Sequence, residues 1–130
     1  MTISLQKALG LVQRALEAGQ AQSVGIVAVV VDLGGHPVAA ARMDGVSFIN
    51  TEVAQRKATL AAAFGTPTHQ LQAMIGKDPI AGPIVSADQR ISLLPGGLPI
   101  LEEGRCIGGL GIAGGHYLQD QAVGEYAIAR

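Results

Sequence analysis

Glycine is concentrated in the apolar C-terminal part of this chain, and this pattern constrains the fold more than any other feature. Gly96 and Gly97 interrupt one apolar stretch, three glycines fall within residues 107–112, and two more follow at 114–115. Glycine inside a strand removes packing side chains and adds an entropic cost on folding, so it is favoured where something must approach the backbone closely. The pattern predicts strands on which a helix, a ligand or a neighbouring subunit lies directly against the backbone.

The composition predicts one domain, residues 1–130, that associates with copies of itself. Hydrophobic residues make up 48% of the chain and charged residues only 15%. A chain of 130 residues buries roughly two thirds of its unfolded surface, and so few charged side chains cover the remainder of a monomer poorly. We therefore expect a homo-oligomer, at least a dimer.

Charge and hydropathy exclude two classes of partner. The formal net charge is -1 and the basic residues are scattered, so the chain lacks the basic stripe typical of nucleic-acid-binding proteins. No apolar run reaches the roughly 20 residues that cross a bilayer, so we expect no membrane contact. Lys7 and Arg14 interrupt the apolar residues near the N-terminus, unlike the core of a signal peptide. The expected location is cytoplasmic.

Hydrophobic periodicity predicts an α+β fold in which helices pack on an antiparallel sheet. Ser4 is the expected N-cap of the first helix and Gly19 its stop, while Gly65 ends a second helix. We expect helices at residues 5–16, at 50 or 51 to 64, at 68–75 and at 119–129, strands at 24–31, 38–43, 99–101 and 105–112, and an edge strand at 84–92.

Arg42 and Asp44 are the first candidate ligand-binding residues. They lie two positions apart at the end of a predicted strand, so both side chains can leave the same face. An arginine fork beside a carboxylate suits a planar anionic ligand, although a surface ion pair would give the same pattern. Gly96 and Gly97 are the second candidates, because a tight glycine turn can direct backbone N–H groups at an anion.

Lys57 is the first candidate catalytic residue. It lies on a predicted helix face with the small residues Ala54, Ala58 and Ala61. A buried ammonium there would be costly and its pKa would be lowered, which suits proton transfer. The alternative is a side chain that follows the alanines to water.

His116 and Asp120 complete the candidate site. His116 follows the glycine pair at 114–115 and precedes Asp120 by four residues, near the start of the last predicted helix. A neutral imidazole oriented by a carboxylate can act as a general base or as an axial iron ligand, and a helix-capping histidine without chemistry is the alternative. No histidine or cysteine pair has the spacing of a zinc site.

A series of short motifs resembles the GlcG/HbpS-like family, whose members also form the C-terminal domain of PduO-type cobalamin adenosyltransferases. The resemblance runs in order over essentially the whole chain. The motifs that carry it are residues 29–32 (Val-Val-Val-Asp), 34–36 (Gly-Gly-His), 42–45 (Arg-Met-Asp-Gly), Ala54 with Lys57 and Ala58, 95–100 (Pro-Gly-Gly-Leu-Pro-Ile), 107–111 (Ile-Gly-Gly-Leu-Gly) and Gln119 with Asp120.

This resemblance implies a profilin-like fold with a five-stranded antiparallel sheet between helices, and a tendency to form dimers and larger assemblies. It also implies two competing functions. One is binding of haem or a related tetrapyrrole, with Arg42 and Lys57 meeting the propionates and His116 at the iron. The other is a lyase, isomerase or hydrolase of a catabolic operon, acting on a small carboxylate-bearing or aromatic metabolite.

Two features of the sequence argue against the haem hypothesis. Haem-binding relatives can carry a histidine on the first helix, and this chain has none between Ser4 and Gly19. Two phenylalanines, two tyrosines and no tryptophan provide little stacking surface. A purely structural, oligomeric accessory protein is the third hypothesis. For both the haem and the enzyme hypothesis, we expect Arg42, Gly97, Lys57 and His116 to meet in one cleft. This cleft would lie where strand ends approach helix starts and would be closed by a neighbouring subunit.

Overall fold

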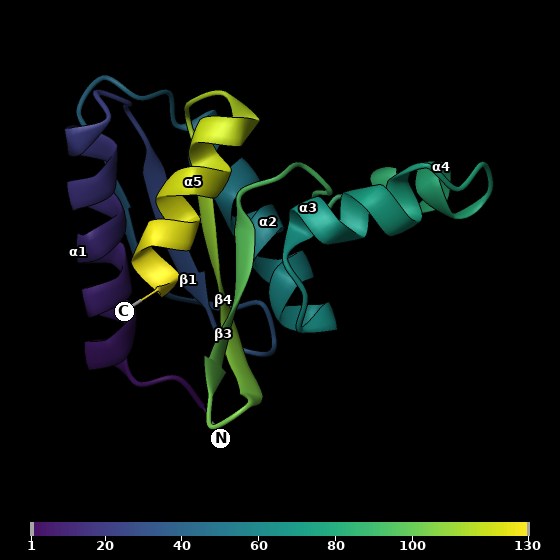
Figure 1. Cartoon of the computed structure of the whole chain (residues 1–130), viewed down its shortest axis with the longest axis horizontal. Helices are drawn as coiled ribbons and strands as arrows, with labels where there is room; N and C mark the ends of the chain where they lie inside the picture. The colour runs from purple at the N-terminus through teal and green to yellow at the C-terminus, as the bar shows by residue number, and fades with distance from the viewer. Residues whose placement is uncertain (1, 130) are drawn as a thin grey trace.

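The computed structural model describes residues 2–129 and confirms an α+β fold with an antiparallel sheet (Figure 1). The strands are β1 (Val27–Val31), β2 (Pro37–Arg42), β3 (Gly97–Glu102) and β4 (Arg105–Ala113), in the order β2-β1-β4-β3. The helices are α1 (Leu5–Ala21), α2 (Ile49–Phe64), α3 (Thr68–Leu71), α4 (Ala81–Ser86) and α5 (Tyr117–Ile128), with a π-helical turn η1 (Gln72–Gly76) after α3.

The sheet has four strands within residues 2–129, so the expectation of five is wrong. The segment 84–92, expected as an edge strand, instead contains the end of α4 and a turn. Asp78 Oδ1 accepts the backbone N–H groups of Ile80 and Ala81 at 2.8 Å, in the turn that leads into that helix. Asp88 Oδ1 accepts the N–H of Arg90 at 2.9 Å and closes the turn. These local side-chain bonds favour helix and turn over an extended chain.

Helices cover both faces of the sheet. α1 and α5 pack side by side on one face, where the buried side chains of the larger core cluster gather, and α2 lies across the other (Figure 1). β1 is buried along its whole length, which agrees with its uniformly apolar sequence. The sheet therefore separates the core under α1 and α5 from the core under α2.

Close packing of α2 on β4 explains the glycines of that strand. A Cβ atom at Gly109 or Gly111 would collide with the carbonyl oxygens of Ala58 and Ala54, respectively. These two alanines on α2 are fully buried. The predicted close approach to the strand backbone is thus confirmed on this face, and the partner is a helix.

The helices differ from the predictions in three respects, two at their ends and one in a buried face. Gly19 does not end α1, which continues to Ala21. The glycine instead lets Met43 and Ile26 pack closely against the helix. Phe64, expected on the buried face of α2, is 55% exposed. The last helix begins at Tyr117, two residues earlier than expected. Gly65 does end α2 in the left-handed conformation, as predicted.

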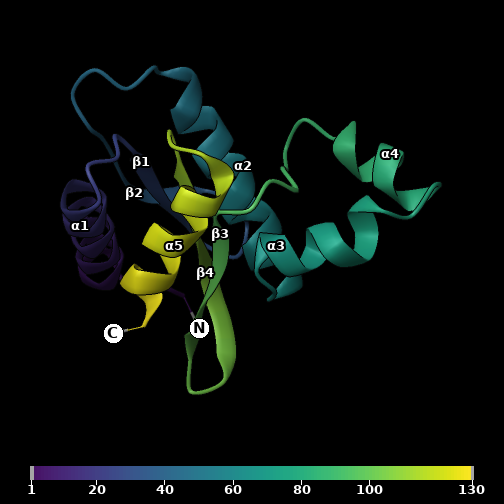
Figure 2. The same cartoon turned by 45° about the horizontal axis from the view of Figure 1, so that its top comes forward.

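The segment α3–η1–α4 extends away from the sheet as an arm, in both views (Figures 1 and 2). Residues 86–96 then lead the chain back from the arm to β3. Three large apolar side chains on the arm, Met74, Ile80 and Ile84, are each about 70% exposed. The arm and its returning segment form one side of the candidate site described next.

Candidate functional site

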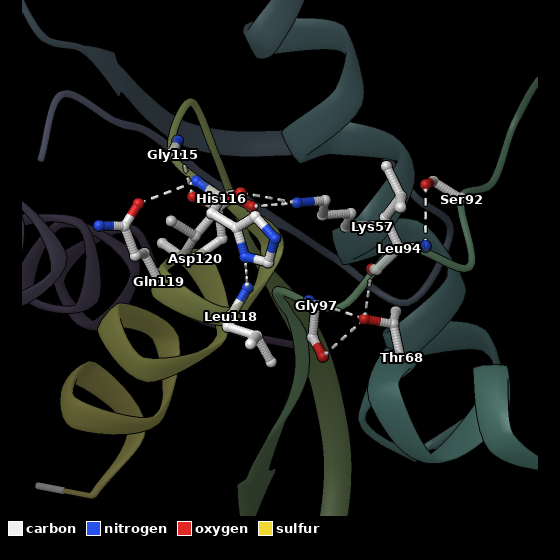
Figure 3. A network of polar contacts seen from close by, with 11 residues as sticks. Lys57, Thr68, Ser92, Leu94, Gly97, Gly115, His116, Leu118, Gln119 and Asp120 are labelled. Carbon is white, nitrogen blue, oxygen red and sulfur yellow. Dashed lines mark hydrogen bonds and ion pairs between the residues drawn. The ribbon is translucent and has the colours of Figure 1, made fainter.

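Lys57 and Asp120 form a buried ion pair between α2 and α5. The Lys57 ammonium lies 3.1 Å from Asp120 Oδ2 and donates to the Ile112 carbonyl oxygen at 2.8 Å. Asp120 Oδ1 accepts the backbone N–H of Gly115 at 3.0 Å. Figure 3 shows the Lys57 ammonium directed at the Asp120 carboxylate. The two side chains therefore hold α2, the end of β4 and the start of α5 together.

Burial dominates the electrostatics of this pair. Lys57 is 1% exposed and Asp120 2%. Burial lowers the pKa of the Lys57 ammonium below its usual value, and the attraction of Asp120 offsets only part of the shift. Burial likewise raises the pKa of the Asp120 carboxyl, against the attraction of Lys57 and the hydrogen bond from Gly115. The prediction that burial lowers the pKa of Lys57 thus agrees with the buried position of this residue. The charged partner of Lys57 is Asp120.

Gly96 covers this ion pair. Its φ angle is +123°, and a Cβ atom there would lie 2.7 Å from the Ile112 oxygen and 2.9 Å from the Lys57 ammonium. Only glycine tolerates both this backbone conformation and this approach. The residue thus closes the lysine off from solvent.

Gly97 is held by Thr68, a buried residue that the sequence analysis did not single out. The Gly97 N–H donates to Thr68 Oγ1 at 2.9 Å, and the hydroxyl donates to the Leu94 carbonyl oxygen at 2.8 Å (Figure 3). The N–H that we expected to meet an anion therefore already has a partner. The hydrogen bonds of Thr68 anchor residues 94–97 to α3.

His116 is the N-cap of α5. Its Nδ1 accepts the backbone N–H of Leu118 at 3.1 Å, and Gln119 Oε1 accepts the His116 N–H at 2.9 Å, which completes a capping box. Because Nδ1 is an acceptor, the proton of the neutral ring is on Nε2. That nitrogen then has no lone pair for iron, so ligation through Nε2 would require loss of the cap.

Arg42 and Asp44 lie apart from these residues. Arg42 ends β2, the edge strand opposite β3, and its guanidinium donates to the Val46 carbonyl oxygen. Both side chains are exposed and line a hollow of about 380 Å³ together with Leu16 and Gln20 of α1. The structure thus brings Lys57, Asp120 and Gly96 together beside His116, and it leaves Arg42 at the other edge of the sheet.

A larger cavity, of about 650 Å³, opens between α2, the arm and the start of α5. Its volume is within the range of small-molecule sites in proteins. Its lining combines apolar side chains with amide, hydroxyl and charged groups. The lining residues are Val53, Arg56, Gln72, Ser86, Ala87, Asp88, Gln89, Ile91, Ser92, Leu93, Leu94, Pro95 and Tyr117.

Arg56 is the cation of this cavity, and it was not among the site residues predicted from the sequence. Its guanidinium makes no hydrogen bond or ion pair with residues 2–129, and the side chain also lines an adjoining polar hollow of about 360 Å³ beside His36. Its backbone oxygen accepts the Ser92 N–H at 3.3 Å, which fixes the cavity wall to α2. Its position three residues after Val53 was the available signal, since that spacing places it beside the buried helix face.

The described residues, 2–129, contain no group of three or more histidine, cysteine, aspartate and glutamate side chains arranged to hold a metal ion. Over the same residues, no helix has both the length and the apolar character needed to cross a membrane.

Comparison with known proteins identifies relatives over almost the whole chain. Residues 3–129 match the family described as "Haem degrading protein HbpS-like". The chain is 32% identical over 130 residues to "Corrinoid adenosyltransferase PduO" of Citrobacter freundii, covering 99% of this chain and 39% of that protein. It therefore spans about two fifths of that relative's length.

Two further proteins are similar over most of their own length. An uncharacterized 15.0 kDa protein from the dhaT-dhaS intergenic region of Citrobacter freundii is 33% identical over 129 residues, which covers 98% of this chain and 90% of that one. A crystal structure of a PduOC:heme complex superposes with a TM-score of 0.88 at 30% identity, covering 99% of this chain and 94% of that one. These similarities confirm the family predicted from the sequence motifs.

Proposed function

The chain belongs to the HbpS-like family, and we propose that the cavity beside Arg56 binds haem or a related tetrapyrrole. The observation that carries the proposal is the combination of apolar lining side chains with an arginine that has no partner among residues 2–129. A tetrapyrrole presents an apolar macrocycle and carboxylates, which such a cavity suits. The similarity to the PduOC:heme complex supports the same ligand class.

The residues of the cavity fit the parts of this ligand. Val53, Ile91 and Leu93 would pack against the macrocycle, and the Arg56 guanidinium would bind a propionate through paired hydrogen bonds. The adjoining hollow beside His36 gives the second propionate a polar path to solvent. When bound, haem supplies an iron centre whose properties depend on its axial ligand and surroundings.

In this proposal the buried residues position the site. The Lys57–Asp120 ion pair fixes α5 and its N-cap beside α2, and Thr68 fixes residues 94–97, of which Leu94 and Pro95 line the cavity. A site held by buried contacts requires less ordering when a ligand binds. Lys57 and Asp120 thus contribute through the shape of the cavity.

Two of our sequence-based expectations remain alternatives to this position and function. In the first, the exposed Arg42–Asp44 hollow would bind an anionic ligand, closed by a neighbouring subunit. Proton transfer by Lys57, Asp120 or His116 on a small carboxylate-bearing or aromatic metabolite would instead make the protein a lyase, isomerase or hydrolase. For that chemistry the 1%-exposed lysine would have to become accessible to the substrate.

Titration with ferric haemin, followed by the shift of its Soret band, tests the proposal. We expect saturable binding by the wild type and a loss of about tenfold or more in affinity for Arg56→Gln, since a hydrogen bond to a charged group contributes about 1.5–3 kcal/mol. Arg42→Gln is the matched control, because it removes a guanidinium from the other hollow. If only Arg42→Gln weakens haemin binding, the haem site lies at the Arg42–Asp44 hollow. Absence of a saturable Soret shift in the wild type would overturn haem binding.

A further inference from the structure

Only one side chain that lines the 650 Å³ cavity is both a good ligand for ferric iron and uncommitted to another partner. The cavity lining contains no histidine, cysteine or methionine. Asp88 does line it, but its carboxylate accepts the Arg90 guanidinium at 2.7 and 3.0 Å and is engaged there. Tyr117 remains, and a phenolate oxygen is an established axial ligand of haem iron.

The position of Tyr117 suits this role. It is the first residue of α5, at the edge of the cavity, and is 44% exposed, so its ring can be reached by a ligand. It follows the N-cap His116, and the centroids of the two rings lie 4.1 Å apart. The capping box fixes the histidine and hence the start of the helix that carries the tyrosine. The backbone that presents the phenol is therefore held by the hydrogen bonds of the cap.

The N-cap geometry also argues against the neighbouring histidine as the ligand. His116 Nδ1 accepts the Leu118 N–H, so Nε2 carries the proton of the neutral ring. Ligation by His116 would cost the helix its cap, whereas ligation by Tyr117 leaves the cap in place. The tyrosine can therefore bind iron without a change in the backbone.

We propose that Tyr117, and not His116, is the axial ligand of ferric haem in this protein. This inference rests on the proposed function. Tyr117 would lose its phenol proton to water as its oxygen binds the iron, with no change in oxidation state. The apolar lining residues would contact the macrocycle, and Arg56 would meet a propionate.

The test compares haemin with metal-free protoporphyrin IX in Tyr117→Phe, using the full chain. Phenylalanine keeps the ring and removes only the ligating oxygen. We expect haemin affinity to fall by about tenfold or more while protoporphyrin affinity stays within about twofold. Resonance Raman spectra of the haemin complex should show iron–phenolate vibrations in the wild type and none in the variant. Circular dichroism verifies that the variant is folded.

Two variants serve as controls. Tyr126→Phe alters the other tyrosine of α5, which is 46% exposed and does not line the cavity, and it should change neither affinity nor spectrum. His116→Asn preserves an N-capping side chain and should retain the iron–phenolate vibrations. An unchanged spectrum in Tyr117→Phe, an equal loss for both porphyrins, or loss of the phenolate signal in His116→Asn would each overturn the assignment. If the wild type binds haemin without phenolate vibrations, haem binding stands and Tyr117 is excluded. If it binds no haemin, both proposals fail.

Discussion

The Lys57 ammonium lies 3.1 Å from Asp120 Oδ2, and this buried pair joins α2 to α5 through two residues that are 63 positions apart in the chain. Each side chain also satisfies a backbone group, the Ile112 carbonyl for the lysine and the Gly115 N–H for the aspartate. Gly96 closes the space above the ammonium. The pair therefore acts as a structural connection beside the cavity.

Removal of one partner of this pair should destabilise the protein strongly. Lys57→Met leaves Asp120 buried without its counter-charge, and the expected loss in the free energy of unfolding is about 3–5 kcal/mol. Asp120→Asn should have a comparable effect for the same reason. The double variant should lose less than the sum of the single variants, because no unpaired charge remains. Urea unfolding of the four proteins measures this coupling, and simple additivity would contradict the prediction.

The pair should also give the stability a defined pH dependence. Because the pKa of Asp120 is raised from 3.8, its contribution is fully present below pH 3.8 and is lost as the pH rises through the folded-state pKa. Because the pKa of Lys57 is lowered from 10.5, its contribution is fully present above pH 10.5 and is lost as the pH falls through the folded-state pKa.

The unfolding free energy of the wild type, relative to that of Lys57→Met/Asp120→Asn, should accordingly be lowest between these two titrations. The groups common to both proteins cancel in this difference. Urea unfolding at a series of pH values measures it. A maximum at intermediate pH would show that the attraction between the charges outweighs their burial.

The contact between α2 and β4 should not tolerate a methyl group. Gly111→Ala places a Cβ atom against the Ala54 carbonyl oxygen, so we expect a loss of about 1–3 kcal/mol or more. Gly10→Ala is the control, since the nearest atom to its added Cβ is the end of the Arg14 side chain at 3.6 Å. In a helix interior this exchange should stabilise by about 0.5–1 kcal/mol. Thermal unfolding of both variants decides whether the close approach is essential.

The exposed apolar side chains of the arm lead us to expect self-association, as the composition does. Met74, Ile80 and Ile84 are exposed by 71%, 74% and 68%. We expect at least a dimer by light scattering at micromolar concentration, and a smaller species for Ile80→Glu/Ile84→Glu, because carboxylates oppose burial of this surface. A monomeric wild type would refute the expectation. An unchanged mass in the variant would place the interface elsewhere.

Elements governed by local sequence could be predicted. The apolar run of β1, the hairpin around residues 102–105 and the glycine stop at Gly65 each depend on near neighbours in the chain. The family motifs also indicated haem as a ligand class. In contrast, residues 84–92 have an apolar pattern that suits a strand, and side-chain bonds from Asp78 and Asp88 direct this region into helix and turn.

The candidate site depended more on the tertiary structure. Lys57, Gly96 and Asp120 were recognised individually from residue type, but only folding shows that they satisfy one another. Arg56 and Tyr117 had no distinctive local pattern and became candidates because α2, residues 86–95 and α5 enclose a cavity between them.

Sequence alone determined most of the helices and strands and where the backbone must be approached closely, because those properties follow from side-chain size, periodicity and glycine. The pairing of Lys57 with Asp120, the capping role of His116 and the separation of Arg42 from the cavity were decided by the tertiary structure. The physical reason is that burial and hydrogen-bond partners depend on which distant segments meet, and these determine whether a polar side chain supports the fold or remains available to a ligand.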